Sequence, residues 1–224
     1  MKLFVIPILI ACLFSTIHSL AATEPTFSPP AVGKNYNTFI PKGWFLLSRK
    51  HLKASSSLAF GDLNHDGIND VVMVISDTKA DESGISENSR KLVILLGEKL
   101  GGYRFSGAYE KVLLCQGCGG QGDPFSNIQI IRGVIVVKHS GGSGNNRWDR
   151  THKWQLRDQS WYLIGHTSRG YFDEISYTSE TNDDNFLTGK RIITKIDHGK
   201  KTILKSNVQG LRPLKMNSFD IDID

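Results

Sequence analysis

From Trp44 onward, the chain is a succession of short runs rich in β-branched and aromatic residues, separated by glycine, asparagine and aspartate turns. The runs recur about every dozen residues, and no stretch shows the 3.6-residue apolar period of an amphipathic helix. Two-residue or three-residue turns are indicated at Arg132-Gly133, Asp158-Gln159-Ser160 and His198-Gly199. The pattern predicts an all-β fold of short antiparallel strands and hairpins, arranged as a sandwich, a barrel or part of a propeller.

The expected strands are the runs in which apolar, β-branched or aromatic residues dominate. They cover 44–48, 71–75, 92–96, 103–106, 111–114, 128–131, 134–138, 148–156, 161–165, 171–177, 191–196 and 202–204.

The N-terminus has the features of a secretory signal peptide. Lys2 precedes an apolar run over 3–14, and Ser19-Leu20-Ala21 places small residues where a signal peptidase reads them. The run is too short and too early in the chain for a membrane anchor. We therefore expect cleavage near Ala21 and export of the mature chain, without a transmembrane anchor, to the periplasm or the medium.

The predicted organisation has four parts. A signal peptide over 1–21 is followed by a Pro-rich linker or arm over 22–42, with Pro25, Pro29, Pro30 and Pro41. A single β-rich domain is expected over 43–215, and an acidic, frayed tail over 216–224.

One loop carries the strongest chemical signal. Oxygen-bearing side chains fall at positions 1, 3, 5 and 9 of the nine residues from Asp62 to Asp70, with Gly67 at the sharp turn of position 6. Ca²⁺ takes six to eight oxygen ligands, and a tight loop with alternate oxygens turned inward supplies them. The alternative is an ordinary Asn/Asp/Gly turn with no metal. Met73 stands where an EF-hand has its Glu, so we expect the loop to lead into a strand.

The stretch Phe60-Gly61-Asp62-Leu63-Asn64-His65-Asp66-Gly67-Ile68-Asn69-Asp70-Val71-Val72 resembles the calcium-binding blade of FG-GAP or VCBS repeats. The similarity continues into Val93-Ile94-Leu95-Leu96-Gly97 and Gly101-Gly102-Tyr103-Arg104-Phe105. The resemblance implies an exported bacterial protein that binds Ca²⁺ through the side chains of Asp62, Asn64, Asp66 and Asp70 and the carbonyl of Ile68. It covers roughly 58–106, and the spacing has no second copy, so a complete propeller is not expected.

Two other acidic segments lack the glycine turn. Asn182-Asp183-Asp184-Asn185 is expected to be a loop, and Asp220-Ile221-Asp222-Ile223-Asp224 belongs to the predicted tail.

Cys115 and Cys118 are the only cysteines that would remain after cleavage. In an exported protein a pair at this spacing favours a local disulfide. A redox site needs a helix after the first cysteine, but glycines and Asp123-Pro124 follow. A zinc site needs two further ligands, and no partner motif stands out.

Two surfaces are candidates for ligand contact. Trp148, Trp154, Trp161 and Tyr162 lie in one predicted hairpin among basic residues, where the alternatives are a glycan-binding face and packing on the core. The stretch 190–215 is strongly basic and is either a solvated hairpin face or a contact for an anionic surface or acidic protein.

Composition limits the function classes only mildly. The chain has 27 Lys and Arg against 22 Asp and Glu, a net charge of +5 that permits an anionic partner without requiring one. No nucleic-acid-binding motif is present, and the export signal also argues against a nucleic-acid partner.

We therefore expect an exported, calcium-binding, β-rich binding module of the bacterial envelope that is not an enzyme and has a protein or glycan partner. One alternative is a periplasmic inhibitor or immunity-type protein that masks a toxin or hydrolase. The other is a hydrolase of envelope polymers, whose catalytic cluster would form only in the folded chain.

Overall fold

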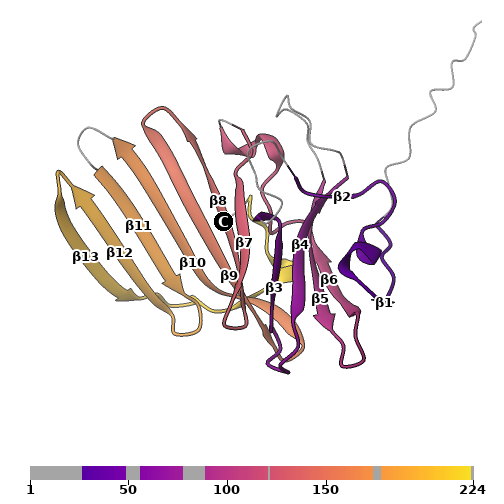
Figure 1. The fold of residues 1–224 in the computed structure, drawn as a ribbon. Coiled ribbons are helices and arrows are strands. Elements are labelled where there is room, and N and C mark those ends of the chain that lie inside the picture. The colour runs from indigo at the N-terminus through magenta and orange to yellow at the C-terminus, as the bar shows by residue number, and fades with distance from the viewer. Residues whose placement is uncertain (1–26, 49–55, 78–88, 121, 174–177, 223–224) are drawn as a thin grey trace, which may run out of the picture.

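The computed structural model describes residues 27–48, 56–77, 89–120, 122–173 and 178–222 (Figure 1). These residues form strands, turns and short 3-10 helices, and no α-helix occurs among them. The strands make two antiparallel sheets, so the predicted all-β class is confirmed.

The first sheet has the strand order β1-β6-β5-β4-β2. Strand β3 also pairs with β4, on the same edge as β2, and β2 and β3 follow one another along that edge. The strands are β1 (Val32–Gly33), β2 (Phe45–Leu46), β3 (Leu58–Gly61), β4 (Asp70–Ser76), β5 (Arg90–Gly97) and β6 (Tyr103–Tyr109).

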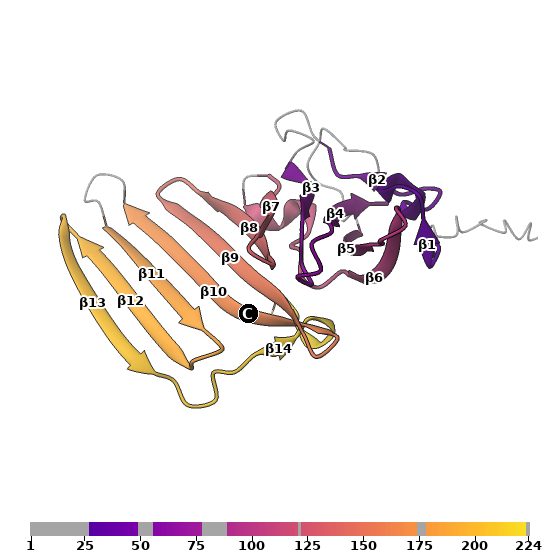
Figure 2. The same cartoon turned by 60° about the horizontal axis from the view of Figure 1, so that its bottom comes forward.

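The second sheet is a meander in which seven strands, β7 to β13, pair in chain order, and it curls as it extends away from the first sheet (Figures 1 and 2). A short eighth strand, β14, pairs with the first half of β10. The strands are β7 (Phe125–Ile131), β8 (Val134–Ser143), β9 (Asn146–Arg157), β10 (Ser160–Asp173), β11 (Thr178–Asn185), β12 (Lys190–Asp197), β13 (Lys200–Asn207) and β14 (Leu214–Lys215).

The three predicted turns join consecutive strands of this meander. Each has positive φ at both central positions, as a type I′ hairpin turn requires: Arg132 and Gly133 (51° and 76°), Asp158 and Gln159 (45° and 59°), and His198 and Gly199 (46° and 77°). Because that backbone twist matches the twist of the flanking strands, these turns fix the pairing of β7 with β8, β9 with β10 and β12 with β13.

The main apolar core lies between the two sheets. From the first sheet, Val72, Val74, Leu92 and Ile94 point toward it, and from the second come buried side chains of β7 to β10 that include Trp154 and Leu163. Alternate residues of β4 and β5 point to the other face of the first sheet. This second set forms a separate buried cluster of Val71, Met73, Ile75, Val93 and Leu95 with Phe39 and Trp44.

The described part of the segment expected to be a linker or arm, from Phe27 onward, is an arm that packs on the first sheet. Its 3-10 helix η1 (Tyr36–Phe39) buries Phe39 completely, and Phe27 packs edge-on to Trp44 at 5.5 Å between ring centroids. This arm covers the outer face of β4 and β5, which explains why those strands are apolar on both sides. The predicted signal peptide lies outside the described residues.

The described part of the segment predicted to be a frayed acidic tail, residues 216–222, contributes three buried side chains to the core. Met216 and Phe219, at the ends of the 3-10 helix η4 (Met216–Ser218), and Ile221 are buried, and the Phe219 ring packs on Trp154 at 5.0 Å. The aspartates of the segment suggest a solvated tail, but Met216 and Phe219 precede them and Ile221 lies between two of them, and these three apolar side chains hold the segment in the core.

Two other local predictions are wrong. The residues 111–114 form a turn and not a strand, although Val112, Leu113 and Leu114 are buried in the core. The polar stretch 182–185, predicted to be a loop, is the end of β11. Backbone pairing with β10 and β12 holds it in the sheet, and Asp184 accepts hydrogen bonds from Arg191 Nε and Nη2, both at 2.6 Å.

The helices that can be described are all single turns, and none has the length or apolar character needed to cross a membrane.

Candidate metal site

The predicted calcium loop connects β3 to β4 at one end of the first sheet (Figure 1). Gly61 ends β3, and Asp70 is the first residue of β4. The loop therefore leads into a buried strand, as the sequence predicted.

The carboxylate and amide oxygens of the loop turn inward onto its own backbone. Asp62 Oδ1 accepts from the amide of Asp66 at 3.2 Å, and Asp62 Oδ2 accepts from Gly67 at 2.9 Å. Asn64 Oδ1 also accepts from Asp66, and Asp66 Oδ1 accepts from Ile68 at 2.8 Å. His65 and Gly67 have positive φ, which closes the loop tightly. Side-chain oxygens at positions 1, 3 and 5 thus accept from the backbone amides of residues 66–68.

Asp70 is buried, unlike the other four predicted ligands. Its side chain is buried, and its two oxygens accept backbone hydrogen bonds from Leu63 (2.7 Å) and Gly97 (2.8 Å). The bond to Leu63 closes the loop on itself, whereas the bond to Gly97 ties it to the end of β5. A side chain at Gly97 would place Cβ 2.6 Å from the carbonyl oxygen of Asn69, so only glycine permits this approach.

The electrostatics of the carboxylates differ with their surroundings. Backbone amides, that of Gly67 foremost, hold the pKa of Asp62 below its ordinary value, because N–H donors favour the ionised form. Burial raises the pKa of Asp70, and the charges of Asp66 and Asp62 raise it further against the opposing amides of Gly97 and Leu63. The loop therefore concentrates negative charge that a bound cation would compensate.

The loop also reaches the second sheet. His65 lies over the β7–β8 turn so closely that a Cβ on Gly133 would be 2.6 Å from its ring. At the end of β3, a Cβ on Gly61 would be 2.7 Å from Ile130 of β7. The loop is thus held to the first sheet through Asp70 and contacts the second through His65.

The donor set suits a hard cation. Asp62, Asn64 and Asp66 offer carboxylate and amide oxygens, the ligand type that Ca²⁺ prefers, and Ile68 follows at the position where such loops use a carbonyl. Among the described residues, no three His, Cys, Asp or Glu side chains are gathered as a ready-made metal cluster. A cation would therefore depend on Asn64 and backbone oxygen as well as on the carboxylates.

An open hollow of about 410 Å³ adjoins the loop. Asn64, Asp66 and Ile68 line one side of it, and Gly97, Glu98, Lys99, Leu100 and Arg104 line the other. Arg104 Nε forms an ion pair with Glu98 Oε1 at 3.0 Å, and both residues line the hollow. The loop oxygens are thus accessible from solvent.

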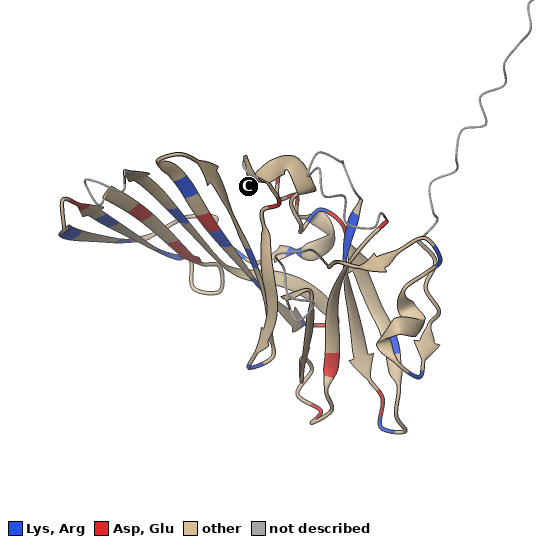
Figure 3. Cartoon of the chain, turned by 45° about the horizontal axis from the view of Figure 1, so that its top comes forward, with Lys and Arg blue, Asp and Glu red and all other residues tan. Residues whose placement is uncertain are grey.

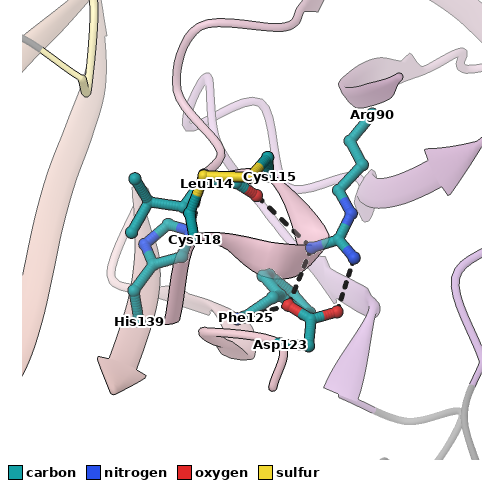
Figure 4. The surroundings of a disulfide bond; sticks show 7 residues. All are labelled: Arg90, Leu114, Cys115, Cys118, Asp123, Phe125 and His139. Carbon is teal, nitrogen blue, oxygen red and sulfur yellow. Dashed lines mark hydrogen bonds and ion pairs between the residues drawn. A yellow bond between two sulfur atoms is a disulfide. The ribbon is translucent and has the colours of Figure 1, made fainter. Parts of the chain in front are cut away.

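The cysteine pair lies in the connection between the two sheets (Figure 4). The sulfur atoms of Cys115 and Cys118 are 2.03 Å apart, the length of a disulfide bond. Cys115 precedes the 3-10 helix η3 (Gln116–Gly119), and Cys118 lies within it. Beside them Arg90 of β5 donates to Leu114 O and to both oxygens of Asp123, at 2.8 and 2.5 Å (Figure 4).

The aromatic hairpin belongs largely to the core. Trp154 and Trp161 are buried there, and Trp148 packs against it. Tyr162 is half-buried with Lys215 Nζ 6.0 Å from its ring centroid. Core packing, rather than a glycan-binding face, accounts for most of these side chains.

Sequence reasoning missed one cluster, formed by three histidines on adjacent strands. His152 of β9 stacks on His166 of β10 at 4.6 Å between ring centroids, and His139 of β8 lies 6.3 Å from His152. Phe219 covers His152 at 5.3 Å. No spacing motif marks these residues, because strand pairing alone brings them together.

Comparison with known proteins found no match to this chain among protein-family models, curated proteins or solved structures.

Proposed function

We propose that this protein is an exported, calcium-binding β-rich module that acts by binding a protein or glycan partner and not by catalysis. The observation that carries the proposal is the Asp62–Asp70 loop, in which the oxygens of Asp62, Asn64 and Asp66 turn inward beside a fixed Asp70. The resemblance to FG-GAP and VCBS loops supports the same ligand.

The proposed role of calcium is structural. The loop is hydrogen-bonded to the first sheet and packs on the β7–β8 turn of the second, so fixing the loop would also hold the sheets together. A ligand that binds only the folded state stabilises it by RT ln(1 + [Ca²⁺]/Kd), about 1.4 kcal/mol at a tenfold excess over Kd. Extracellular modules use sites with Kd values on the order of 10⁻⁴ to 10⁻³ M, which suits an exported protein.

The test compares thermal unfolding in calcium and in EGTA for the protein and for Asp66→Asn. Calcium should raise the midpoint of the unchanged protein by roughly 3–6 °C, given about 2–4 °C per kcal/mol for a domain of this size. Asp66→Asn retains an oxygen that can accept from Ile68 but removes one charge. We expect its midpoint in EGTA to stay close to that of the unchanged protein and its response to calcium to be lost.

Asp197→Ala is the matched control, because it removes an exposed carboxylate beside the β12–β13 turn, at the far edge of the second sheet. It should keep the full calcium response. Equal midpoints in calcium and EGTA for the unchanged protein, with no heat of binding in calorimetry, would refute the metal site.

A further inference from the structure

The β12–β13 hairpin extends beyond the apolar core. Within the described residues, neither buried apolar cluster includes a side chain of β12 or β13, and every residue of β13 is exposed. Figures 1 and 2 show these strands at the outer end of the curled second sheet. The hairpin therefore adds little to the stability of the core.

The outer edge of β13 is open. In the part of the chain that the structure describes, β13 pairs with β12 and with no other strand. In an antiparallel ladder, the N–H and C=O groups of alternate residues point away from the partner strand. About half of the backbone groups of β13 are thus available to a further strand.

Basic residues are concentrated in the hairpin that forms this edge. Residues 190–207 include six Lys and Arg and one acidic residue, a local net charge of +5 that equals the net charge of the whole chain. Arg191 and Lys195 of β12 pair with Asp184 and Glu180 of β11, whereas β13 itself carries Lys200, Lys201 and Lys205 and no acidic residue. Figure 3 shows basic residues along the outer strands of the second sheet.

One face of the edge strand has a defined pattern. Lys201, Ile203 and Lys205 share a face because they alternate along β13, and their partners on β12 are Ile196, Thr194 and Ile192. Ile203 is 49% exposed, and Leu204 on the opposite face is 52% exposed. The edge thus presents an apolar side chain between two lysines.

We propose that β13 binds an extended acidic segment of another protein, which joins the second sheet as an additional strand. On one face this segment would carry an acidic, an apolar and an acidic residue at alternate positions, opposite Lys201, Ile203 and Lys205. The proposal rests on the proposed function only in treating the molecule as a binding module, and it does not require calcium.

A second copy of this chain fits the edge poorly, because pairing β13 with itself would bring two lysine-rich strands together. An anionic membrane would satisfy the lysines but would leave the outward backbone groups of β13 to water. An acidic polypeptide strand satisfies the charges, Ile203 and the backbone edge together.

The test uses a fluorescent peptide with the sequence TETVTET, titrated with the full protein in calcium and in EGTA. Two further probes share its length: TKTVTKT, and a TETVTET peptide N-methylated at alternate amides. We expect saturable binding of TETVTET alone, since methylation removes the strand hydrogen bonds and lysine reverses the charge. Hydrogen exchange should show slower exchange of alternate β13 amides when the peptide is bound.

The variant Lys201→Glu/Lys205→Glu should weaken peptide binding about tenfold or more. The control Lys34→Glu/Lys42→Glu makes the same change in net charge at exposed positions outside the second sheet and should alter binding less than about twofold. Because β13 is exposed throughout, the test variant should fold normally, which its unfolding midpoint verifies.

The proposal would be overturned if the N-methylated peptide bound as tightly as TETVTET. It would also be overturned if the Lys34→Glu/Lys42→Glu control weakened binding as much as Lys201→Glu/Lys205→Glu. Binding to phosphatidylglycerol vesicles without binding to TETVTET would also reject it, in favour of a membrane surface. Failure of the calcium proposal would be seen separately, as unchanged melting in EGTA with peptide binding intact.

Discussion

At the scale of single residues, burial changes the chemistry of His139 on β8. Its side chain is almost fully enclosed, and Leu114 N lies 3.4 Å from its Nε2, which accepts the hydrogen bond. Burial chiefly, with unfavourable electrostatic interactions with His152, Arg90 and Arg150, lowers its pKa from 6.5 to about 3. The folded protein thus holds this imidazole neutral at pH values where an unfolded chain would protonate it.

Acid should therefore destabilise the protein through His139. Between its folded and unfolded pKa values the unfolded state binds the extra proton, so stability is lost as the pH falls below about 6.5. The loss from this group between pH 7 and pH 5 is about 2 kcal/mol. His139→Gln retains a hydrogen-bond acceptor and cannot titrate, so its urea midpoint should fall less over this interval.

His198→Gln is the comparison for that experiment, because His198 is exposed at the β12–β13 turn. Between pH 7 and pH 5, the urea midpoint of the His198→Gln variant should fall as much as that of the unchanged protein. If the urea midpoint of His139→Gln fell as much as those of the unchanged protein and of His198→Gln, His139 would not be the source of the acid destabilisation.

The tight loop from Asp62 to Asp70 could be predicted because the residues that shape it are close in sequence. Glycine at position 6 and alternating oxygens are local features, and the inward-turned Asp62, Asn64 and Asp66 follow from them. The two bonds of Asp70 were not predicted. One of them reaches Gly97, and nothing in the nine-residue pattern indicates which distant strand end lies beside the loop.

The histidine cluster illustrates a different limit. Continued from the Asp158-Gln159 turn without interruption, the pairing of β9 with β10 would place His152 opposite Gly165. An irregularity between Leu163 and Gly165 shifts the register by one residue, and His152 then lies opposite His166. The sequence predicts the turn but not the shift, so the stacked histidines could not be foreseen.

At the scale of elements, strands rich in β-branched and aromatic residues were predicted, and β1, β3, β11 and β14 were missed. The strands that overlap predicted runs, because pleated strands favour these residue types, are β2, β4, β5, β6, β7, β8, β9, β12 and β13. Strand β11 lacks that signature, since ion pairs and the ladders on both sides support it. Two predicted strands, 161–165 and 171–177, are joined in β10, although 174–177 lies outside the described residues.

The η4 segment should contribute strongly to stability despite its acidic neighbours. Phe219 is 4% exposed and contacts Trp154 and His152. Phe219→Ala should cost about 3 kcal/mol, because it leaves a cavity in the core. Denaturant unfolding measures this loss.

Leu214→Ala in β14 provides the control, since Leu214 is 43% exposed. Its cost should stay below about 1 kcal/mol. Similar small losses for the two variants would show that the segment is not part of the stable core in solution.

At the scale of the whole molecule, a buried ion pair connects the two sheets. Arg90 begins β5 of the first sheet, and Asp123 precedes β7 of the second, with side chains 2% and 7% exposed. Asp123 also accepts from the amide of Phe125 at 2.8 Å. The pair thus orients the connection that carries the disulfide (Figure 4).

Asp123→Ala should destabilise the protein by about 3–5 kcal/mol, because the buried guanidinium loses its carboxylate. The double variant Arg90→Met/Asp123→Leu should recover much of that loss, since no charge then remains buried at this position. Chemical unfolding of the single and double variants measures the coupling. A double variant less stable than Asp123→Ala would contradict the ion-pair account.

The number of sheets and their order could not be predicted. Hairpin turns specify which strands are neighbours within the meander, but the packing of one sheet on the other depends on contacts between residues far apart in sequence. Gly61 against Ile130 and His65 against Gly133 are such contacts, and neither glycine carries a sequence signal for them.

The burial of Met216, Phe219 and Ile221 has a consequence for the timing of folding. The backbone amide of Ile221 donates to Lys111 O at 2.9 Å, and Lys111 Nζ pairs with Asp220 across 109 residues of sequence. Each hairpin of the meander can form as soon as its two strands leave the ribosome. The core over Trp154 closes only after residue 221 has been made, so a nascent chain remains incompletely folded until then.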